Sequence, residues 1–101
     1  HDFLRHIQRT KLLIHLIDGA AKDPLEDVLV IEKELLAYGH ELMKRPRLMV
    51  LNKQELLNQG QHEEIIKDLE KRTKKTVISI SAAMGKGLDQ LLLNVWEELG
   101  I

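Results

Sequence analysis

The residues best suited to chemistry are Asn52, Lys53 and Glu55, which follow an apolar run at residues 48–51. A carboxylate such as that of Glu55 can accept hydrogen bonds from both N1–H and the exocyclic amino group of guanine, a pair of donors that adenine does not offer. The aliphatic stem of Lys53 can lie along the flat face of a base, while the Asn52 amide can donate to and accept from neighbouring loops. The pattern therefore predicts a site selective for guanine.

A second group, Ser81, Ala82 and Ala83, follows another apolar run at residues 77–80. In a tight turn after a strand, the backbone N–H of Ala82 can donate to guanine O6, where adenine carries an amino group. Leaving one partner of such a buried polar pair unsatisfied costs roughly 1–3 kcal/mol, which is enough to discriminate between the two purines. The two groups together favour a guanine site more strongly than either does alone.

Other chemistry-bearing residues give weaker indications. Asp18 follows a third apolar run, but no serine or histidine is placed to partner it as a catalytic acid, so we expect helix capping. His15 lies within that run and is expected to be a neutral, hydrogen-bonded core residue. The five histidines show no metal-ligand spacing, and no metal site is expected. Trp96 follows the apolar spacing of the last helix and is assigned to the core, and residues 70–75 are assigned to a solvated basic helix end.

An alternation of short apolar runs and amphipathic segments must position these residues. Three runs are typical of strands buried on both faces: residues 12–17, 48–51 and 77–80. Helical patterns cover residues 2–9, the segment from Pro24 behind an Asp23 N-cap to Gly39, residues 61–72 and residues 87–99. Right-handed crossovers place consecutive parallel strands side by side, so the sequence predicts an α/β fold: one three-stranded parallel sheet with helices on both faces.

Ligands of open parallel sheets bind beyond the carboxyl ends of the strands, which is where the two predicted groups of residues should meet. Two features are unusual for a complete domain. The helical pattern at residues 2–9 begins without a cap, and the strand at residues 12–17 leaves an unpaired sheet edge, which proteins usually protect. We therefore expect further sequence upstream of this chain.

Composition and charge narrow the classes of function. The 15 basic and 16 acidic side chains give a net charge of −1, which excludes a generally basic nucleic-acid coat and gives no indication of DNA binding. Apolar residues at 44% and charged residues at 31% are typical of one folded domain, and the absence of cysteine excludes disulfides and thiolate metal sites. The apolar stretches are far shorter than the ~20 residues of a membrane span, so we expect a cytoplasmic protein without membrane association.

Motifs along the whole chain carry a family resemblance: His1-Asp2-Phe3-Leu4-Arg5-His6-Ile7, Leu16-Ile17-Asp18, Asp23-Pro24-x-Glu26-Asp27, Lys33-Glu34-Leu35, Arg45-Pro46, Asn52-Lys53 and Ile80-Ser81-Ala82. In these motifs the sequence resembles the Obg family of GTPases. The resemblance implies that residues 1–101 are the base-recognition second half of a Ras-like P-loop GTPase domain. It puts Asn52, Lys53 and Glu55 on the guanine-specifying motif. Ser81, Ala82 and Ala83 would form the last base-contacting loop.

The resemblance also implies an activity and partners. Obg-like proteins are cytosolic, Mg²⁺-dependent hydrolases of GTP to GDP that associate with the large ribosomal subunit during its assembly. An RNA contact at residues 70–75 becomes conceivable in that setting. The family usually has aspartate where Glu55 stands, and the extra methylene would extend the carboxylate by about 1.5 Å. Weaker guanine affinity than is usual for the family is therefore expected.

The phosphate-binding half of such a domain is not found in this sequence. Phosphate binding needs the pattern Gly-x-x-x-x-Gly-Lys-Ser/Thr at the start of a helix, and nothing here satisfies it. The tripeptide Gly85-Lys86-Gly87 is followed by Leu88 where a hydroxyl is required, so it is interpreted as a flexible entry to the last helix. No aspartate has glycine three residues later, as a switch loop requires. The chain alone should therefore be inactive, with the Mg²⁺ ligands upstream.

Two other classes of function remain open. The chain could be a non-catalytic α/β protein-interaction module, in which the exposed edge of the first strand receives a partner and the Asn-Lys motif is vestigial. It could also be a flavodoxin-like enzyme that uses Asp18. A preference for GDP over ADP indicates the first class, no nucleotide binding the second, and adenine or flavin binding the third.

Overall fold

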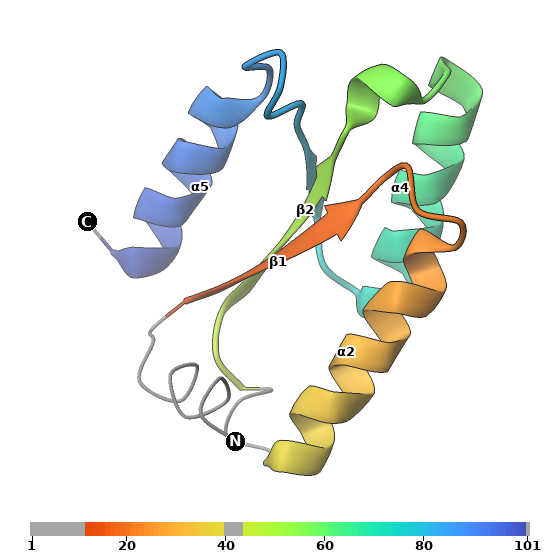
Figure 1. Ribbon diagram of the computed structural model, residues 1–101. Helices are drawn as coiled ribbons and strands as arrows, with labels where there is room; N and C mark the ends of the chain where they lie inside the picture. The colour runs from red at the N-terminus through yellow and green to blue at the C-terminus, as the bar shows by residue number, and fades with distance from the viewer. Residues whose placement is uncertain (1–11, 40–43, 101) are drawn as a thin grey trace.

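The computed structural model describes residues 12–39 and 44–100, and its elements follow the predicted alternation (Figure 1). In chain order they are β1 (Leu13–Asp18), α2 (Pro24–Tyr38), β2 (Arg47–Asn52), the 3₁₀ helix η1 (Gln54–Leu56), α4 (Gln59–Thr73), β3 (Val77–Ser79) and α5 (Leu88–Leu99). The helix expected at residues 2–9 lies outside the described residues. No helix in the described ranges has the length and apolar character needed to cross a bilayer.

The three strands form one parallel sheet in the order β1-β2-β3, as predicted. Asp18 at the end of β1 is level with Asn52 at the end of β2, and Leu51 is level with Ser79 at the end of β3. The carboxyl ends of all three strands therefore lie at the same edge of the sheet. The loops that follow them meet there (Figure 1).

Helices cover both faces of the sheet, which confirms the predicted fold class. On one face, α2 and α4 pack over a core formed by Ile17, Val28, Met49, Leu51, Leu69 and Val77. The helix α5 lies on the other face (Figure 1). Its Leu91 and Val95 pack against a second core formed by Leu48, Val50, Ile78 and Ile80. The central strand β2 contributes to both cores, and it is almost completely buried because both helical layers cover it.

Local sequence signals account for most helix ends. Asp23 Oδ1 accepts the Glu26 N–H over 3.1 Å at the start of α2, and the Gly39 N–H donates to the Leu35 carbonyl over 3.2 Å at its end. Asn58 and Gln61 form a reciprocal capping box at the start of α4, two residues before the predicted start. These contacts satisfy backbone groups that lack partners within the helix.

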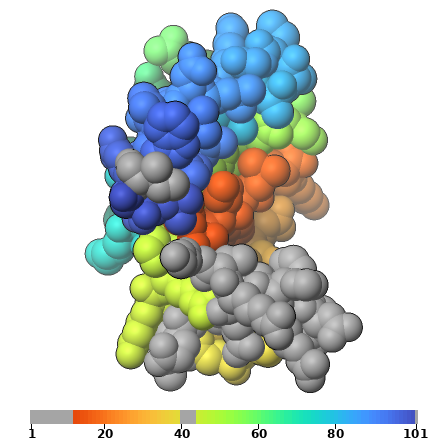
Figure 2. Space-filling model, turned by 90° about the vertical axis from the view of Figure 1, so that its left-hand side faces the viewer, coloured from red at the N-terminus to blue at the C-terminus, as the bar shows by residue number. Residues whose placement is uncertain are grey.

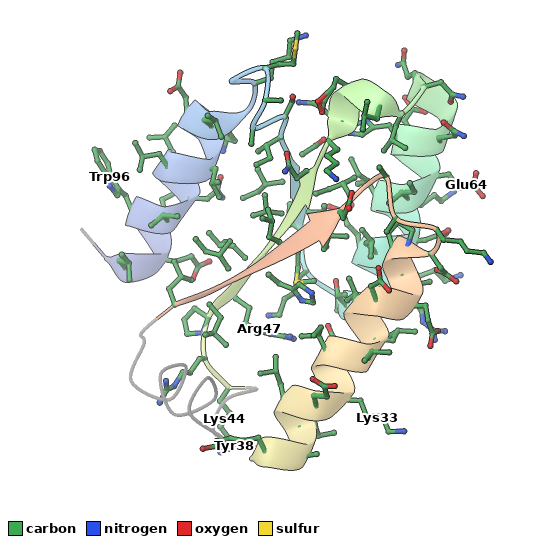
Figure 3. The ribbon with its side chains drawn as sticks, viewed as in Figure 1. Lys33, Tyr38, Lys44, Arg47, Glu64 and Trp96 are labelled. Carbon is green, nitrogen blue, oxygen red and sulfur yellow. The ribbon has the colours of Figure 1, made fainter. Side chains whose placement is uncertain are left out.

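Two expectations of burial are wrong. β1 is not buried on both faces, because its Ile14 and Leu16 side chains are 50% and 60% exposed. Trp96 is not a core residue, since it is 49% exposed and projects away from the sheet (Figure 3). β1 is exposed because α5 covers β2 and β3 but leaves the β1 side of this face open, whereas Trp96 is exposed because α5 packs on the sheet through Leu91 and Val95. Figure 2 shows β1 at the surface beside α5.

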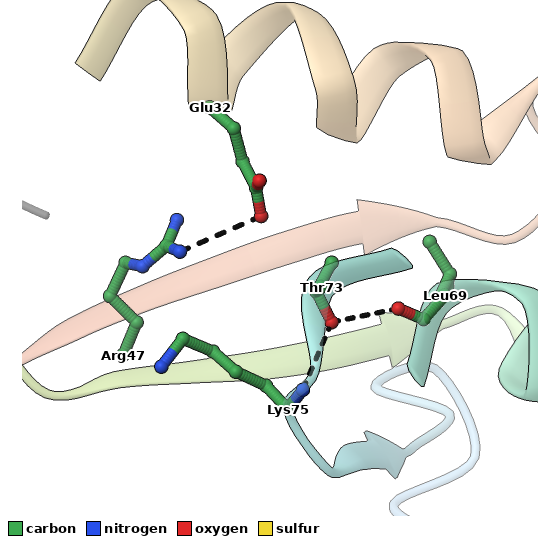
Figure 4. Close-up of polar contacts among 5 residues, drawn as sticks. All are labelled: Glu32, Arg47, Leu69, Thr73 and Lys75. Atoms are coloured by element: carbon green, nitrogen blue, oxygen red, sulfur yellow. Dashed lines mark hydrogen bonds and ion pairs between the residues drawn. The ribbon is translucent and has the colours of Figure 1, made fainter. Parts of the chain in front are cut away.

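A polar cluster lies at the opposite end of the strands from the predicted site. The Arg47 side chain, only 4% exposed, pairs with Glu32 Oε1 over 3.5 Å (Figure 4). His15 on the neighbouring strand is partly buried, and its Nδ1 has no hydrogen-bond partner, contrary to expectation for that atom. Burial and then the Arg47 charge lower the pKa of His15, because both disfavour its cationic form.

Residues 70–75 form the end of α4 and the turn after it. The Thr73 hydroxyl donates to the Leu69 carbonyl over 2.7 Å and accepts the Lys75 N–H over 3.3 Å (Figure 4). Glu70 accepts the Val77 N–H over 2.9 Å, which joins this turn to β3. Lys71, Arg72 and Lys74 are exposed, as the assignment to a solvated basic helix end predicts.

Candidate functional site

The candidate site lies where the loops after β1, β2 and β3 meet. β2 ends at Asn52, and the chain passes through Lys53, whose φ of +67° lies in the left-handed region, into η1. The Gln54 N–H donates to the Ile80 carbonyl over 3.2 Å and holds η1 beside the end of β3. Glu55 is therefore presented by a short helix that is hydrogen-bonded to the neighbouring strand's end.

Ser81 connects the two groups of residues predicted from the sequence. Its hydroxyl donates to Glu55 Oε2 over 2.8 Å, and the same oxygen accepts the Met84 N–H over 3.1 Å. Ser81 is fully buried, whereas Glu55 is exposed. The hydroxyl thus fixes one carboxylate oxygen from the protein side. An ionised carboxylate has about four acceptor positions, so capacity for a ligand remains.

Asn52 and Ala82 form a second contact between these loops. The Ala82 N–H donates to Asn52 Oδ1 over 3.0 Å. The N–H that the sequence assigns to guanine O6 is therefore paired within the protein. Ala82 can donate to a ligand only if Asn52 Oδ1 shares or releases this N–H. Ala83 follows in the same loop and is exposed.

Lys53 contacts a residue from the third loop. Its ammonium group donates to Asp18 Oδ2 over 3.1 Å, which links the carboxyl ends of β1 and β2. The expectation that Asp18 caps a helix is wrong. Its Oδ1 accepts the Ala20 N–H over 2.9 Å and closes the turn after β1, because α2 begins only at Pro24 and is capped by Asp23.

Hydrogen bonds keep Asp18 ionised. The Ala20 N–H, and after it the Lys53 ammonium group, hold the pKa of the Asp18 carboxyl below its ordinary value. Both donors interact with the charged form of the carboxyl more strongly than with the neutral form. The site therefore contains a charged Asp18 carboxylate paired with the Lys53 ammonium group.

Gly19 is a site residue that sequence reasoning missed. Its N–H donates to the Asn52 carbonyl over 3.0 Å, and a Cβ atom at this position would lie 2.6 Å from the same oxygen. Only glycine allows the turn after β1 to approach β2 this closely. The available signal was its position directly after Asp18, at the carboxyl end of a predicted strand.

The loop between β3 and α5 is closed by paired backbone groups. Ser81 and Lys86 each donate an N–H to the carbonyl oxygen of the other over 3.0 Å. Gly87 has a φ of +77°, and a Cβ atom there would lie 2.5 Å from the Ser79 carbonyl oxygen. A close backbone approach, and not only a flexible helix entry, therefore accounts for this glycine.

The arrangement can recognise a flat polar ligand. It presents a carboxylate, an amide, an ammonium group and a backbone N–H at one edge of the sheet. Within residues 12–39 and 44–100, no group of three or more histidine, aspartate or glutamate side chains is placed to hold a metal ion. An open depression of about 440 Å³ lies beside the site, between the β1–α2 loop and α4, but none of the six predicted residues lines it.

The sequence of this chain is similar to proteins named GTPase Obg, whereas no protein-family model matches it. A relative from Parasynechococcus marenigrum is 60% identical over 101 residues. Relatives from Prochlorococcus marinus and from a Synechococcus species are 59% and 56% identical over the same length. Each alignment covers 100% of this chain and 31% of the relative. The chain therefore spans about a third of the length of these curated relatives.

Proposed function

This chain belongs to the Obg family of GTPases, and from that premise we propose that it supplies guanine recognition to a GTP-binding protein. The six residues concerned are Asn52, Lys53, Glu55, Ser81, Ala82 and Ala83. Five of them gather at the carboxyl edge of the parallel sheet through hydrogen bonds between its loops. This is the edge at which open α/β sheets bind their ligands.

The contact between Ser81 and Glu55 is the observation that carries the proposal. Because the buried Ser81 hydroxyl holds Glu55 Oε2 at 2.8 Å, the carboxylate is positioned before a ligand arrives. It then accepts N1–H and the exocyclic N2–H of guanine through its remaining acceptor positions. Adenine has no hydrogen on N1 and no amino group at C2, so it leaves this carboxylate without those partners.

The other residues complete the contact with the base. The methylene stem of Lys53 lies along the face of the purine. The Ala82 N–H is shared between Asn52 Oδ1 and guanine O6. The Asn52 amide keeps the loops after β2 and β3 together. Glu55 in place of the family's usual aspartate makes the affinity for guanine weaker than is usual.

Phosphate binding and hydrolysis belong to the rest of a family protein. The whole protein hydrolyses GTP to GDP with Mg²⁺, acts in the cytoplasm and associates with the large ribosomal subunit during its assembly. The metal ligands and the phosphate loop lie in the part of the family's length that this chain does not span. Residues 1–101 alone are inactive. Turnover of GTP by the isolated chain would therefore contradict the proposal that hydrolysis needs the rest of the protein.

A chimera tests guanine recognition. In it, this chain replaces the matching segment of the Parasynechococcus marenigrum relative, and GDP and ADP are titrated by calorimetry. We expect preference for GDP. Glu55→Ala and the equal-sized Glu55→Gln should each lower GDP affinity by about 10- to 100-fold, because hydrogen bonds to a charged group are worth roughly 1.5–3 kcal/mol. Glu55→Asp should keep the preference. Unchanged purine selectivity in Glu55→Ala contradicts the proposal.

A second candidate function is a protein-interaction module. The exposed Ile14 and Leu16 side chains on the edge strand β1 favour it, since an exposed apolar edge is a surface for strand addition. The same titration separates the two functions. A well-folded chimera that binds neither GDP nor ADP supports the interaction module and excludes guanine recognition.

A further inference from the structure

Asp18 belongs to neither of the two groups of residues that define the proposed guanine site, yet it contacts Lys53 of the first group directly. Its Oδ2 accepts a hydrogen bond from Lys53 Nζ over 3.1 Å, although the two residues are 35 positions apart in the sequence. The parallel register of β1 and β2 brings them together, because it pairs Asp18 with Asn52. We propose that Asp18 is a positioning residue that holds the Lys53 side chain in place to receive the base. This inference rests on the proposed function.

The turn after β1 fixes the Asp18 carboxylate. Oδ1 accepts the Ala20 N–H over 2.9 Å, and the backbone carbonyl of Asp18 accepts the Ala21 N–H over 3.1 Å. One carboxylate oxygen is thus used to hold the turn, and the other is presented to Lys53. The Ala20 N–H and the Lys53 ammonium group also hold the pKa of Asp18 below its ordinary value, so the anchor is charged at neutral pH.

Gly19 holds this turn against β2. Its N–H donates to the Asn52 carbonyl over 3.0 Å, and the 2.6 Å approach that a Cβ would make to that oxygen shows how close the two backbones lie. The Asp18 backbone therefore cannot move away from β2 without breaking this contact to Asn52. The position of the anchor is set by the same strand that carries the base-recognition motif.

The contact with the Asp18 carboxylate orders the Lys53 side chain. The Lys53 backbone has φ +67° and ψ 34°, so the chain leaves the extended conformation of β2 at this residue. A lysine side chain has many rotamers in water, and ordering it during ligand binding weakens affinity. Pairing its ammonium group with Asp18 selects one direction for the methylene stem before the ligand arrives. Both side chains are nearly half exposed, at 45% and 48%, so the effect should be modest.

A double-mutant cycle in the chimera tests the proposal. GDP affinity is measured by calorimetry for the parent, Asp18→Asn, Lys53→Met and the double variant. Asparagine keeps an acceptor for the Ala20 N–H but removes the charge, and methionine keeps an apolar stem that cannot pair with Asp18. The matched control is Asp23→Asn, which removes the same charge from the α2 cap, where asparagine caps equally well.

We expect Asp18→Asn to lower GDP affinity about two- to fivefold with Lys53 present and to have no effect in the Lys53→Met background. Asp23→Asn should leave affinity unchanged. An equal loss in both backgrounds would show that Asp18 acts only on the fold of the turn, and the proposal would be wrong. No loss, or a gain in affinity, overturns it too, since a gain means that the pair holds Lys53 away from the base.

The same data separate this inference from the proposed function. If Glu55→Ala removes the preference for GDP over ADP while Asp18→Asn changes nothing, guanine recognition stands and only the role of Asp18 fails. If the parent chimera has no guanine preference, the proposed function fails first and the role of Asp18 fails with it.

Discussion

Ser81 has a structural role that its residue type does not suggest. It is fully buried, yet its hydroxyl serves both as donor to Glu55 and as acceptor for the Met84 N–H. One small side chain thus orients the carboxylate and closes the turn before α5. Replacing the hydroxyl by a methyl group would therefore remove both contacts at once.

Ser81→Ala should weaken both stability and ligand binding in the chimera. It leaves the Met84 N–H without its acceptor, so we expect a loss of about 1–2 kcal/mol in the free energy of unfolding, measured with urea. GDP affinity should fall several-fold because Glu55 loses its support. Ser79→Ala is the control, since Ser79 contacts His62 on α4 and not Glu55. A similar loss of GDP affinity in both variants would argue against a specific role for Ser81.

His15 should make stability depend on pH. Its pKa is lower in the folded chain than in the unfolded chain, so the unfolded state binds the proton more tightly. Above the ordinary histidine pKa of about 6.5, His15 is neutral in both states and its titration does not change the free energy of unfolding. As the pH falls below that value, stability is progressively lost. Urea unfolding at pH 7.5 and 5.5 measures the free energy of unfolding. From the higher to the lower pH, this free energy should decrease more for the parent chimera than for His15→Gln. Equal decreases would contradict this.

At the scale of elements, the loop between β3 and α5 contains two glycines in similar backbone conformations. Gly85 and Gly87 both have positive φ in the loop before α5, at +70° and +77°. A Cβ at Gly85 would meet nothing within 4 Å, whereas one at Gly87 would lie 2.5 Å from the Ser79 carbonyl oxygen. The two positions therefore share a backbone conformation and differ in the space around it.

Alanine substitutions at Gly85 and Gly87 distinguish the cost of the left-handed backbone conformation from the cost of a steric clash. Gly85→Ala should cost about 1 kcal/mol in unfolding free energy for the left-handed conformation alone. Gly87→Ala should cost about 2 kcal/mol or more beyond that, because β3 and α5 must separate. Urea denaturation of both variants of the chimera measures the difference. Equal costs would mean that the loop moves freely from β3.

At the scale of the whole molecule, one face of the sheet is only partly covered. Ile14 and Leu16 of β1 are exposed on it, and Leu92, Trp96 and Leu99 of the neighbouring helix α5 are exposed as well. Figure 2 shows the two elements side by side at the surface. An apolar patch of this kind is typical of a contact surface. Since the chain spans 31% of its relatives, we expect other segments of a family protein to cover it.

Substitutions at Leu16 and Leu56 test whether other segments cover the β1 face. The two residues are a matched pair because they are 60% and 62% exposed in this chain. In the chimera, Leu16→Lys should lower the free energy of unfolding by about 1.5 kcal/mol or more relative to Leu56→Lys, the value of burying one leucine. Thermal unfolding of both variants provides the measurement. Similar melting temperatures would mean that the β1 face stays open in the longer protein, as the interaction-module function requires.

The sequence by itself determined the order of the elements and the edge at which the candidate site lies. Apolar runs and helical spacing are local patterns, and right-handed connection of parallel strands makes the strand order follow the chain. Asn52 and Ser81 could therefore be placed at neighbouring strand ends without a structure. The helix caps at Asp23 and Gly39 were equally local and equally predictable.

Only the tertiary structure decided which side chains touch. The contacts of Ser81 with Glu55, of Ala82 with Asn52 and of Lys53 with Asp18 join residues 26, 30 and 35 positions apart. No periodicity encodes such pairs, because they depend on register and on how closely two loops approach. Trp96 shows the same limit: its spacing matches a buried stripe, but its burial depends on whether another part of the fold lies against it.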